Sequence, residues 1–516
     1  MTSDGNRLAI AFGSETGNAR RLAERLGLDP AFAPFEPSIT PLGEFDLAAF
    51  DHRHRLVIIS SSFGDGEPPA NAEGFLERLK DLPQPQRLRY AIFGIGDVAY
   101  PHFCGFTKGL DAALRDAGAV PFANRVDADT DFDGFFEIWR SALLSALKGD
   151  EAAALSLALQ VKSYGENNTF DAPIIERQTL NGTAPFAWHY RFGIEGSGIN
   201  YRAGDNLYLV PENDPELLSQ LAEWFGEPGA FELFSAKELR SIGKSFLRQL
   251  ARLTENNALK ELLKIANKIA LEDYLYGRDL LDILQDFATP GAVAAAEVAS
   301  HLPAIQPRAY SIASHGNPDY IDLCIRNVSY ELQGRRRAGA ATGYLDRTTG
   351  TVPIFVRANP RFHLSSASDH PLILVGTGTG IGPFMGMLEQ AGRSARSAHT
   401  CLVFGDRRSS SDFLYEDRIR NWERSDVVGS LITAFSRDGA EPYYVQHALM
   451  ENADHIWQLL DQGAHVYVCG NKANLDRSID DVIRNIAARA GGLPEDRAEH
   501  FVHELVLNER LHKELY

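Results

Sequence analysis

The sequence has few cysteines, no long hydrophobic run and no excess of positive charge. Its four cysteines, at positions 104, 324, 401 and 469, are far apart and form no CxxC pair, so neither a disulfide framework nor a zinc site is expected. No stretch approaches the ~20 apolar residues that span a bilayer. The net charge of −18 argues against nucleic acid or an anionic membrane as the main partner. With a polar beginning that lacks a signal-peptide core, these features predict a cytoplasmic protein.

The length of 516 residues predicts about three domains, given roughly 150 residues for each. In residues 1–148, β-rich runs at 7–12, 55–60 and 90–93 alternate with helical segments that begin near Asn18, Ala72 and Phe106. This alternation is typical of a doubly wound parallel sheet, although the proline-rich stretch between Gly27 and His54 gives little sign of its second strand. Residues 149–157 are small and mildly charged, and we expect them to form a short linker.

The pattern changes at residue 158. Trp188, Tyr190 and Phe192 alternate with smaller or polar residues, which predicts a half-buried antiparallel strand and a β-barrel over 158–365, interrupted by a helical insertion at about 215–300. In residues 366–516, hydrophobic runs at 372–375, 400–404 and 466–468 each lead to a glycine and then to a helical segment. The predicted fold class is therefore α/β multidomain: a doubly wound sheet, a barrel domain and a second α/β domain.

Three loops at predicted strand ends mark a ligand site in the first domain. Residues 14–19, Ser-Glu-Thr-Gly-Asn-Ala, join a strand to a helix and direct amides and hydroxyls toward one anion, although such a turn alone is more often a plain helix cap. Loops 61–69 and 94–104 follow the next strands, and the carboxyl ends of parallel strands converge. We therefore expect a phosphate-bearing ligand at this edge.

These three loops resemble the flavodoxin family over its whole length. The resemblance implies FMN, with Tyr100 stacked on the flavin ring and a core tyrosine as the alternative for that residue. The FMN-binding residues that it implies are Ser14, Glu15, Thr16, Gly17, Asn18, Ala19, Ser61, Ser62, Gly64, Asp65, Gly66, Gly94, Gly96, Asp97, Tyr100, Phe103 and Cys104.

Two further anion sites lie in the second half of the chain. Arg308, Tyr310 and Ser311 place a cation, a ring and a hydroxyl on one strand, which by itself is also compatible with an ordinary barrel strand. About thirty residues later, residues 339–345 form another turn that leads into a helix. A glycine cluster follows at 376–382, and in this order and spacing it favours a dinucleotide site.

Residues 158–516 resemble the ferredoxin-NADP reductase family. The resemblance implies that Arg308 and Thr342, with Gly339 and Ala341, hold the FAD pyrophosphate, while Tyr310 packs along the flavin. The loop implied to cradle the pyrophosphate of the nicotinamide dinucleotide contains Gly376, Thr377, Gly378, Thr379 and Gly380.

The same resemblance implies NADPH rather than NADH. Ser436, Arg437 and Tyr444 match the positions that bind the 2′-phosphate, whereas Pro442 stands where a lysine is usual. That missing charge is worth about 1 kcal/mol if it is exposed. Gln446 and Arg407 complete the predicted nucleotide site, with an exposed surface arginine as the alternative for Arg407.

Four residues match the hydride-transfer constellation of diflavin reductases: Ser311 at the flavin N5, Cys469, an acidic residue near the C-terminus and a terminal aromatic. Here the acidic residue is Glu514, where aspartate is usual, and the aromatic is Tyr516. The alternative for Cys469 is a buried structural cysteine, and the alternative for Tyr516 is a frayed chain end.

The combined resemblance, to NADPH-dependent diflavin reductases, implies an enzyme that passes electrons from NADPH through FAD and FMN to an acceptor protein. The haem subunit of sulfite reductase is the first expectation for the acceptor. A haem monooxygenase or another metalloenzyme is the alternative, and a flavin-binding regulatory protein without turnover is a third reading. Residues 1–150 carry a net charge of −7, which either steers a basic partner or only solvates the surface.

Overall fold

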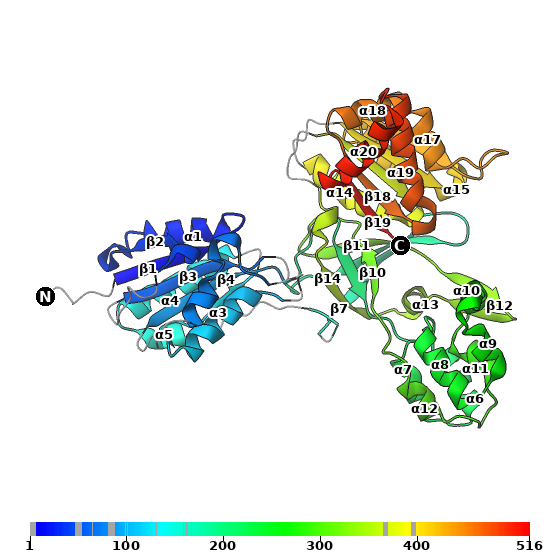
Figure 1. Ribbon diagram of the computed structural model, residues 1–516, viewed down its shortest axis with the longest axis horizontal. Coiled ribbons are helices and arrows are strands. Elements are labelled where there is room, and N and C mark those ends of the chain that lie inside the picture. Colours follow the sequence, from blue (N-terminus) through cyan, green and yellow to red (C-terminus); the bar gives the residue numbers. More distant parts are fainter. Residues whose placement is uncertain are drawn as a thin grey trace. The chain divides into compact units, whose positions relative to one another are not determined.

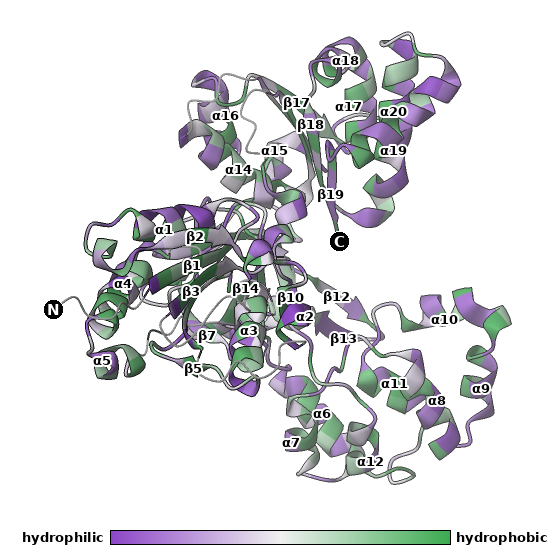
Figure 2. Ribbon diagram, turned by 60° about the vertical axis from the view of Figure 1, so that its left-hand side comes forward, coloured by the Kyte–Doolittle hydropathy of each residue, from purple (hydrophilic) through white to green (hydrophobic). Residues whose placement is uncertain are grey.

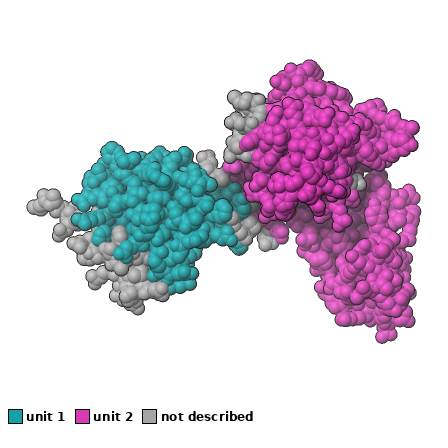
Figure 3. Space-filling model, turned by 45° about the horizontal axis from the view of Figure 1, so that its top comes forward, with its two compact units in different colours: residues 1–165 teal, residues 166–516 magenta. Residues whose placement is uncertain are grey.

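The computed structural model describes residues 7–46, 54–63, 66–80, 88–98, 100, 102–129, 132–157, 159, 164–166, 168–364, 370–393 and 399–516. The chain divides into two compact units, Met1–Gly165 and Glu166–Tyr516, which Figure 3 shows in different colours. Within the described ranges, no helix combines the length and the apolar character needed to cross a bilayer.

The first unit is a parallel sheet with helices on both faces (Figure 1). Its strand order is β2-β1-β3-β4-β5, with β6 also beside β4. The strands are β1 (Arg7–Gly13), β2 (Ser38–Pro41), β3 (His54–Ser61), β4 (Arg89–Ile95), β5 (Val120–Pro121) and β6 (Val126–Ala128). The helices are α1 (Asn18–Gly27), α2 (Phe75–Lys80), α3 (Gly105–Asp116), α4 (Asp133–Leu147) and α5 (Glu151–Leu155). The predicted doubly wound sheet is confirmed, and the poorly signalled second strand is β2, at the edge.

Alternate residues of β1 build two cores. Leu8 and Ile10 pack with α1, α4 and α5 on one face of the sheet, and Ala9 and Ala11 pack with α2 and α3 on the other. Because both faces are covered, the central strands are nearly continuous runs of hydrophobic residues, as Figure 2 shows for β1 and β3.

The expected linker at 149–157 is largely part of the first unit, because α5 occupies its centre. Ala154 is fully buried in the core, and its carbonyl accepts a hydrogen bond of 3.0 Å from the Asn124 amide. The Asn124 side chain also donates to the Leu155 and Leu157 carbonyls. The run of alanines and leucine favours a helix, and burial of one of its faces fixes the segment against the sheet.

The second unit begins with an antiparallel barrel. Its strand order is β10-β9-β14-β7-β8-β11, and the bridge between Ile312 and Leu323 joins the two ends of that order. The strands are β7 (Phe170–Thr179), β8 (Ala187–Gly193), β9 (Asn206–Leu209), β10 (Arg308–Ser311), β11 (Tyr320–Arg326) and β14 (Thr351–Arg357). A hairpin of β12 (Ser329–Leu332) and β13 (Arg335–Ala338) leads into α13 (Ala340–Arg347). The predicted barrel is therefore confirmed.

A group of helices separates β9 from β10, and Figure 1 shows it in green. It has its own hydrophobic core, which explains why helical periodicity interrupts the strand pattern of the sequence. The helices are α6 (Pro215–Phe225), α7 (Ala230–Ser235), α8 (Lys244–Leu253), α9 (Asn257–Leu262), α10 (Lys268–Leu275), α11 (Leu280–Phe287) and α12 (Ala295–Ser300).

The second unit ends in another parallel sheet, of order β17-β16-β15-β18-β19. The strands are β15 (Leu372–Thr377), β16 (Thr400–Asp406), β17 (Ser430–Phe435), β18 (His465–Gly470) and β19 (Leu511–Leu515). The helices are α14 (Gly382–Arg393), α15 (Ser409–Asp412), α16 (Glu416–Arg424), α17 (Val445–Glu451), α18 (Ala453–Asp461), α19 (Lys472–Arg489) and α20 (Glu495–Leu507). The strand order reverses between β15 and β18, and ligands of such sheets bind at that reversal, outside the carboxyl ends of the strands.

Candidate functional site

In the first unit, hydrogen bonds join the loops that follow β1 and β3. The Ser14 amide donates to the Asn71 side chain at 2.7 Å, and the Ala70 amide donates to the Glu15 carboxylate at 3.0 Å. Asn71 was not among the predicted site residues, although it fixes the start of the phosphate-type loop. Nothing in the local sequence pattern singles it out.

The loop after β4 joins the same edge. The Ser62 amide donates to the Ile95 carbonyl at 2.9 Å, and the Ser62 hydroxyl accepts from the Phe106 amide at 3.2 Å. A Cβ atom on Gly66 would lie 2.9 Å from the His102 side chain, so the second and third loops are in close contact. The predicted convergence of the three loops is therefore confirmed, whereas Gly64 and Asp65 lie outside the described residues.

The first of these loops suits a phosphate. The Ser14 hydroxyl is buried and has no hydrogen-bond partner in the described part of the chain. Gly17 has a φ of +89° and precedes the ten-residue helix α1, whose first amides have no partners within the helix. A buried orphan hydroxyl beside a helix N-terminus is the donor set that an FMN phosphate requires.

The second unit contains a cavity of about 1220 Å³ between the barrel and the parallel sheet. It brings together a large part of the predicted FAD and nucleotide residues: Tyr310, Ser311, Thr342, Thr377, Gly378, Thr379, Arg407, Ser436, Tyr444, Gln446, Glu514 and Tyr516. The other predicted residues of this unit are not in its lining: Arg308, Gly339, Ala341, Gly376, Gly380, Arg437 and Cys469.

Ser311 and Glu514 line this cavity, and Cys469, outside the lining, is close to both. The Ser311 hydroxyl donates to Glu514 at 3.4 Å, and Asn359 donates to the other carboxylate oxygen. Cys469 on β18 pairs with Glu514 on β19, so the two residues are neighbours in adjacent strands. Serine, cysteine and glutamate therefore form one cluster, although they are far apart in the sequence.

Burial controls the charge of this cluster. It raises the pKa of Glu514, against the hydrogen bonds from Asn206, Asn359 and Ser311, which lower it. It also raises the pKa of the fully buried Cys469 thiol, and the nearby Glu514 charge adds to that effect. Cys469 is therefore held as the neutral thiol, a small hydrogen-bonding group and not a nucleophile.

The C-terminal residue is firmly held. The Tyr516 amide donates to the Gly470 carbonyl at 3.1 Å, and the Lys472 amide donates to the Tyr516 carbonyl at 2.9 Å. The Tyr516 hydroxyl is 3.0 Å from the Thr379 hydroxyl in the glycine-rich loop. These bonds show that the chain end is not frayed, and they place its ring in the lining of the cavity.

Close backbone contact shapes the glycine-rich loop. A Cβ atom on Gly380 would lie 2.2 Å from the Cys469 carbonyl oxygen, so only glycine fits there. Gly378 has a φ of +56°, and a Cβ atom on it would meet no atom of the described residues nearer than 3.8 Å. The loop leads through η7 (Gly378–Ile381) into the twelve-residue helix α14. An open glycine face at a helix N-terminus fits the pyrophosphate of a dinucleotide.

Arg308 reaches the predicted FAD region from β10. Its guanidinium forms a 2.7 Å ion pair with Glu238, a buried residue between α7 and α8. Burial works to raise the pKa of Glu238, but hydrogen bonds from Arg308 and from the Ser241 and Arg240 amides outweigh it, and the pKa is lowered. Glu238 was missed by the sequence analysis; it orients Arg308 and partly neutralises it.

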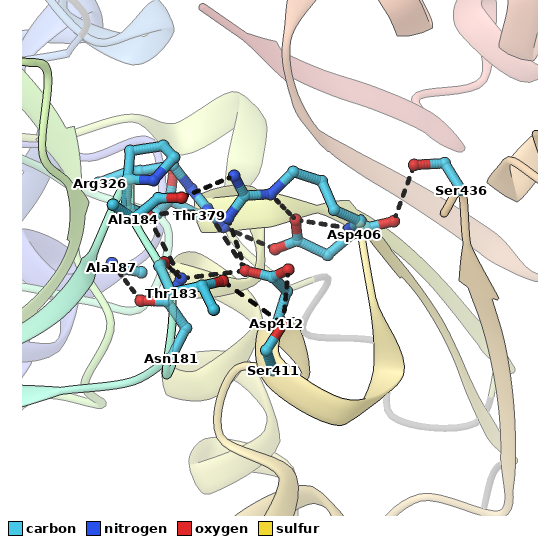
Figure 4. A network of polar contacts seen from close by, with 12 residues as sticks. Asn181, Thr183, Ala184, Ala187, Arg326, Thr379, Asp406, Ser411, Asp412 and Ser436 are labelled. Carbon is cyan, nitrogen blue, oxygen red and sulfur yellow. Dashed lines mark hydrogen bonds and ion pairs between the residues drawn. The ribbon is translucent and has the colours of Figure 1, made fainter. Parts of the chain in front are cut away.

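Of the predicted 2′-phosphate residues, Ser436 and Arg437 directly follow β17, and Tyr444 directly precedes α17. The Ser436 amide donates to the Asp406 carbonyl at 3.0 Å, and the Arg437 amide donates to the Arg407 carbonyl at 2.7 Å. The Arg407 side chain forms a 2.6 Å hydrogen bond with buried Asp412, in the network of Figure 4. Neither reading of Arg407 anticipated this partner.

The cavity lining also includes residues that the sequence analysis did not select: Asn206, Arg326, Asp406, Asn471 and Lys513. Asn206, Arg326, Asp406 and Asn471 stand at or beside strand ends, whereas Lys513 stands in the middle of β19. Polar residues are common at strand ends, and this position alone singles none of them out. Asn359, which binds Glu514, was missed for the same reason.

Fold and site together define a class of protein, the flavin-dependent oxidoreductases that use a nicotinamide nucleotide. The sequence matches the flavodoxin family over residues 10–153 and the oxidoreductase NAD-binding domain over residues 374–478. Among curated proteins, it is similar to the sulfite reductase [NADPH] flavoprotein alpha-component of Bacillus subtilis, 32% identical over 99% of this chain and 89% of that protein. It is 30% identical to the protein of the same name from Photobacterium profundum, over 99% of this chain and 89% of that protein. The chain belongs to the sulfite reductase flavoprotein alpha-component family.

Proposed function

We propose that this protein is an NADPH-dependent diflavin reductase that delivers electrons to the haem subunit of a sulfite reductase. One observation carries the proposal: one cavity is lined by Ser311 from the barrel, by the loop after β15, by Glu514 from β19 and by Tyr516, the residue after β19. When bound, NADPH supplies two electrons as a hydride, and FAD and FMN divide them into single electrons for the acceptor.

The residues of the chain act by orientation. Ser311 presents its hydroxyl beside Glu514, and the carboxylate is held in place by Ser311 and Asn359. A carboxylate near a nicotinamide favours the positive charge that develops as hydride leaves. Tyr516, anchored through its backbone and through Thr379, limits access of water and of the nicotinamide to this point.

We assign the predicted cofactor residues to the same scheme. Residues 1–148 bind FMN, residues 158–365 bind FAD with an insertion at about 215–300, and residues 366–516 bind NADPH. The orphan Ser14 hydroxyl supports the first assignment, and the open face of Gly378 supports the third. Four free, buried cysteines support a reducing cytoplasmic compartment for the protein.

Anaerobic titration of the purified protein with NADPH tests the relay. Uptake of about four electrons per chain is expected, because two flavins accept two each. Uptake of two electrons would contradict a two-flavin relay, and no bleaching would refute the reductase assignment.

Transfer to the acceptor is tested by mixing the reduced protein with the haem subunit from the same organism. Sulfide formation from sulfite that depends on both proteins is expected. Rapid cytochrome c reduction without any sulfide formation would support the relay and refute the proposed acceptor.

A further inference from the structure

An ion pair lies against the open face of the glycine-rich loop. Arg326, the last residue of β11, donates to the carboxylate of Asp406, the last residue of β16, at 2.6 Å. A Cβ atom on Gly378 would lie 3.8 Å from the Arg326 guanidinium and 3.9 Å from the Asp406 carboxylate. Both side chains line the cavity beside that loop, and their exposed fractions are only 20% and 6%.

This arrangement places the negative charge of Asp406 close to the site where the proposed function requires a negatively charged pyrophosphate. A pyrophosphate at Gly378 would lie within a few ångströms of the Asp406 carboxylate, and like charges repel strongly in a poorly solvated site. The Arg326 guanidinium, at the end of β11, donates a 2.6 Å hydrogen bond to that carboxylate and balances its charge.

Arg326 also has the capacity to bind the phosphate itself. Its guanidinium carries five N–H donors, and the described residues take up two of them, at Asp406 and at the Pro185 carbonyl. Asp412, 3.9 Å away, is already bound to Arg407 and to Asn181. Figure 4 shows Asp412 beside Asn181. The fork geometry of arginine suits simultaneous contact with a carboxylate and a phosphate.

We propose that Arg326, supplied by the barrel, is a binding residue for the dinucleotide pyrophosphate and neutralises Asp406 beneath it. The inference rests on the proposed function, because it requires a nicotinamide dinucleotide on the loop at 376–382. Arg326 supplies this cavity with a positive charge, whereas Pro442 stands where a lysine is usual at the 2′-phosphate.

A structural alternative is that Arg326 only ties the barrel to the parallel sheet, through Pro185, Asp406 and Asp412. In that case its loss would disturb the whole nucleotide site, including Ser436, whose amide and hydroxyl both donate to the Asp406 carbonyl. The two roles differ in which part of the nucleotide they affect.

The test is calorimetric binding of NADP⁺ and of 2′-AMP to the full-length, flavin-loaded protein. 2′-AMP carries the 2′-phosphate but no pyrophosphate. We expect Arg326→Gln to weaken NADP⁺ binding by about 10-fold or more and to leave 2′-AMP binding unchanged. Adding Asp406→Asn should restore much of the NADP⁺ affinity, and Asp406→Asn alone should bind NADP⁺ at least as tightly as the wild type.

Several results would overturn the inference. They are unchanged NADP⁺ binding by Arg326→Gln, an equal loss for NADP⁺ and 2′-AMP, or no recovery in the double variant. If Arg326→Gln fails to retain FAD, weaker NADP⁺ binding by Asp406→Asn alone would still refute it. If the wild type binds neither nucleotide, the proposed function itself fails, and the inference fails with it.

Discussion

Gly380→Ala places a methyl group where the structure has no room for one. Its Cβ atom would lie 2.2 Å from the Cys469 oxygen, 2.5 Å from the Cys469 carbonyl carbon and 2.8 Å from the Gly470 nitrogen. All three are backbone atoms of the end of β18, so no side-chain rotation relieves the clash. Ordinary contact begins at 3.4 Å, and the glycine-rich loop and β18 must therefore separate by roughly 1 Å.

The separation has two expected consequences. Overpacking of this kind costs about 1–3 kcal/mol of folding free energy. Displacement of catalytic groups by about 1 Å lowers turnover by about 10- to 100-fold. The loss of stability is measured as the midpoint concentration of guanidinium chloride at which the full-length protein releases its flavins. The loss of turnover is measured as the rate of NADPH-dependent ferricyanide reduction at saturating NADPH.

Gly392→Ala is the matched control, because Gly392 lies near the other end of α14. Among the described residues, its Cβ atom would meet only Val427, at an ordinary 3.4 Å. Alanine favours a helix over glycine by about 1 kcal/mol, so this variant should be equally or more stable and fully active. If Gly380→Ala matched the wild type in both assays, the close packing of the loop on β18 would be refuted.

Three further predictions concern pH and the chain end. Because the pKa of Glu514 is raised, the carboxylate ionises only as pH rises through that higher value. Turnover should therefore decrease below that pH. Glu514→Gln should not show this decrease in its pH–rate profile. Burial and neighbouring His512, Arg510 and His370 lower the pKa of His465 to about 4, below its unfolded value. The folded state therefore favours the uncharged imidazole, and its full stability is present above the unfolded pKa. That stability should be lost as pH falls from about 6.5 toward 4, and His465→Gln should show a weaker loss by denaturant titration. Tyr516→Phe loses the 3.0 Å bond to Thr379, worth about 1 kcal/mol, and should shift the KM for NADPH by less than tenfold; an unchanged KM and kcat would refute a role for this bond.

Much of the fold could be predicted because its signals are local. The runs at 7–12, 55–60 and 90–93 became β1, β3 and β4. Gly376, Gly405 and Gly470, which follow the later hydrophobic runs, lie in the last two residues of β15, β16 and β18. β19 was missed, because Leu-His-Lys-Glu-Leu has a weak apolar pattern and is stabilised as a strand only by pairing with β18. Helix α5, within the predicted linker at 149–157, was not expected, because the burial of Ala154 depends on a core formed by distant residues.

The candidate site shows the same division. Ser311, Cys469, Glu514 and Tyr516 were selectable from the sequence, because each stands at a position where a family motif places it. Asn359, Glu238 and Arg326 were not, since their roles arise from partners more than 60 residues away: Glu514, Arg308 and Asp406.

By itself, the sequence determined the periodicity of strands and helices, the glycines at the turns and the chemical groups available for phosphate and flavin. These depend on short-range backbone geometry and on composition. Only the tertiary structure decided which charges are neutralised, which carboxylate is kept buried and which chain end lies in the cavity. Burial and pairing act through space, between β11 and β16 or between β18 and β19, and a linear order of residues does not contain those distances.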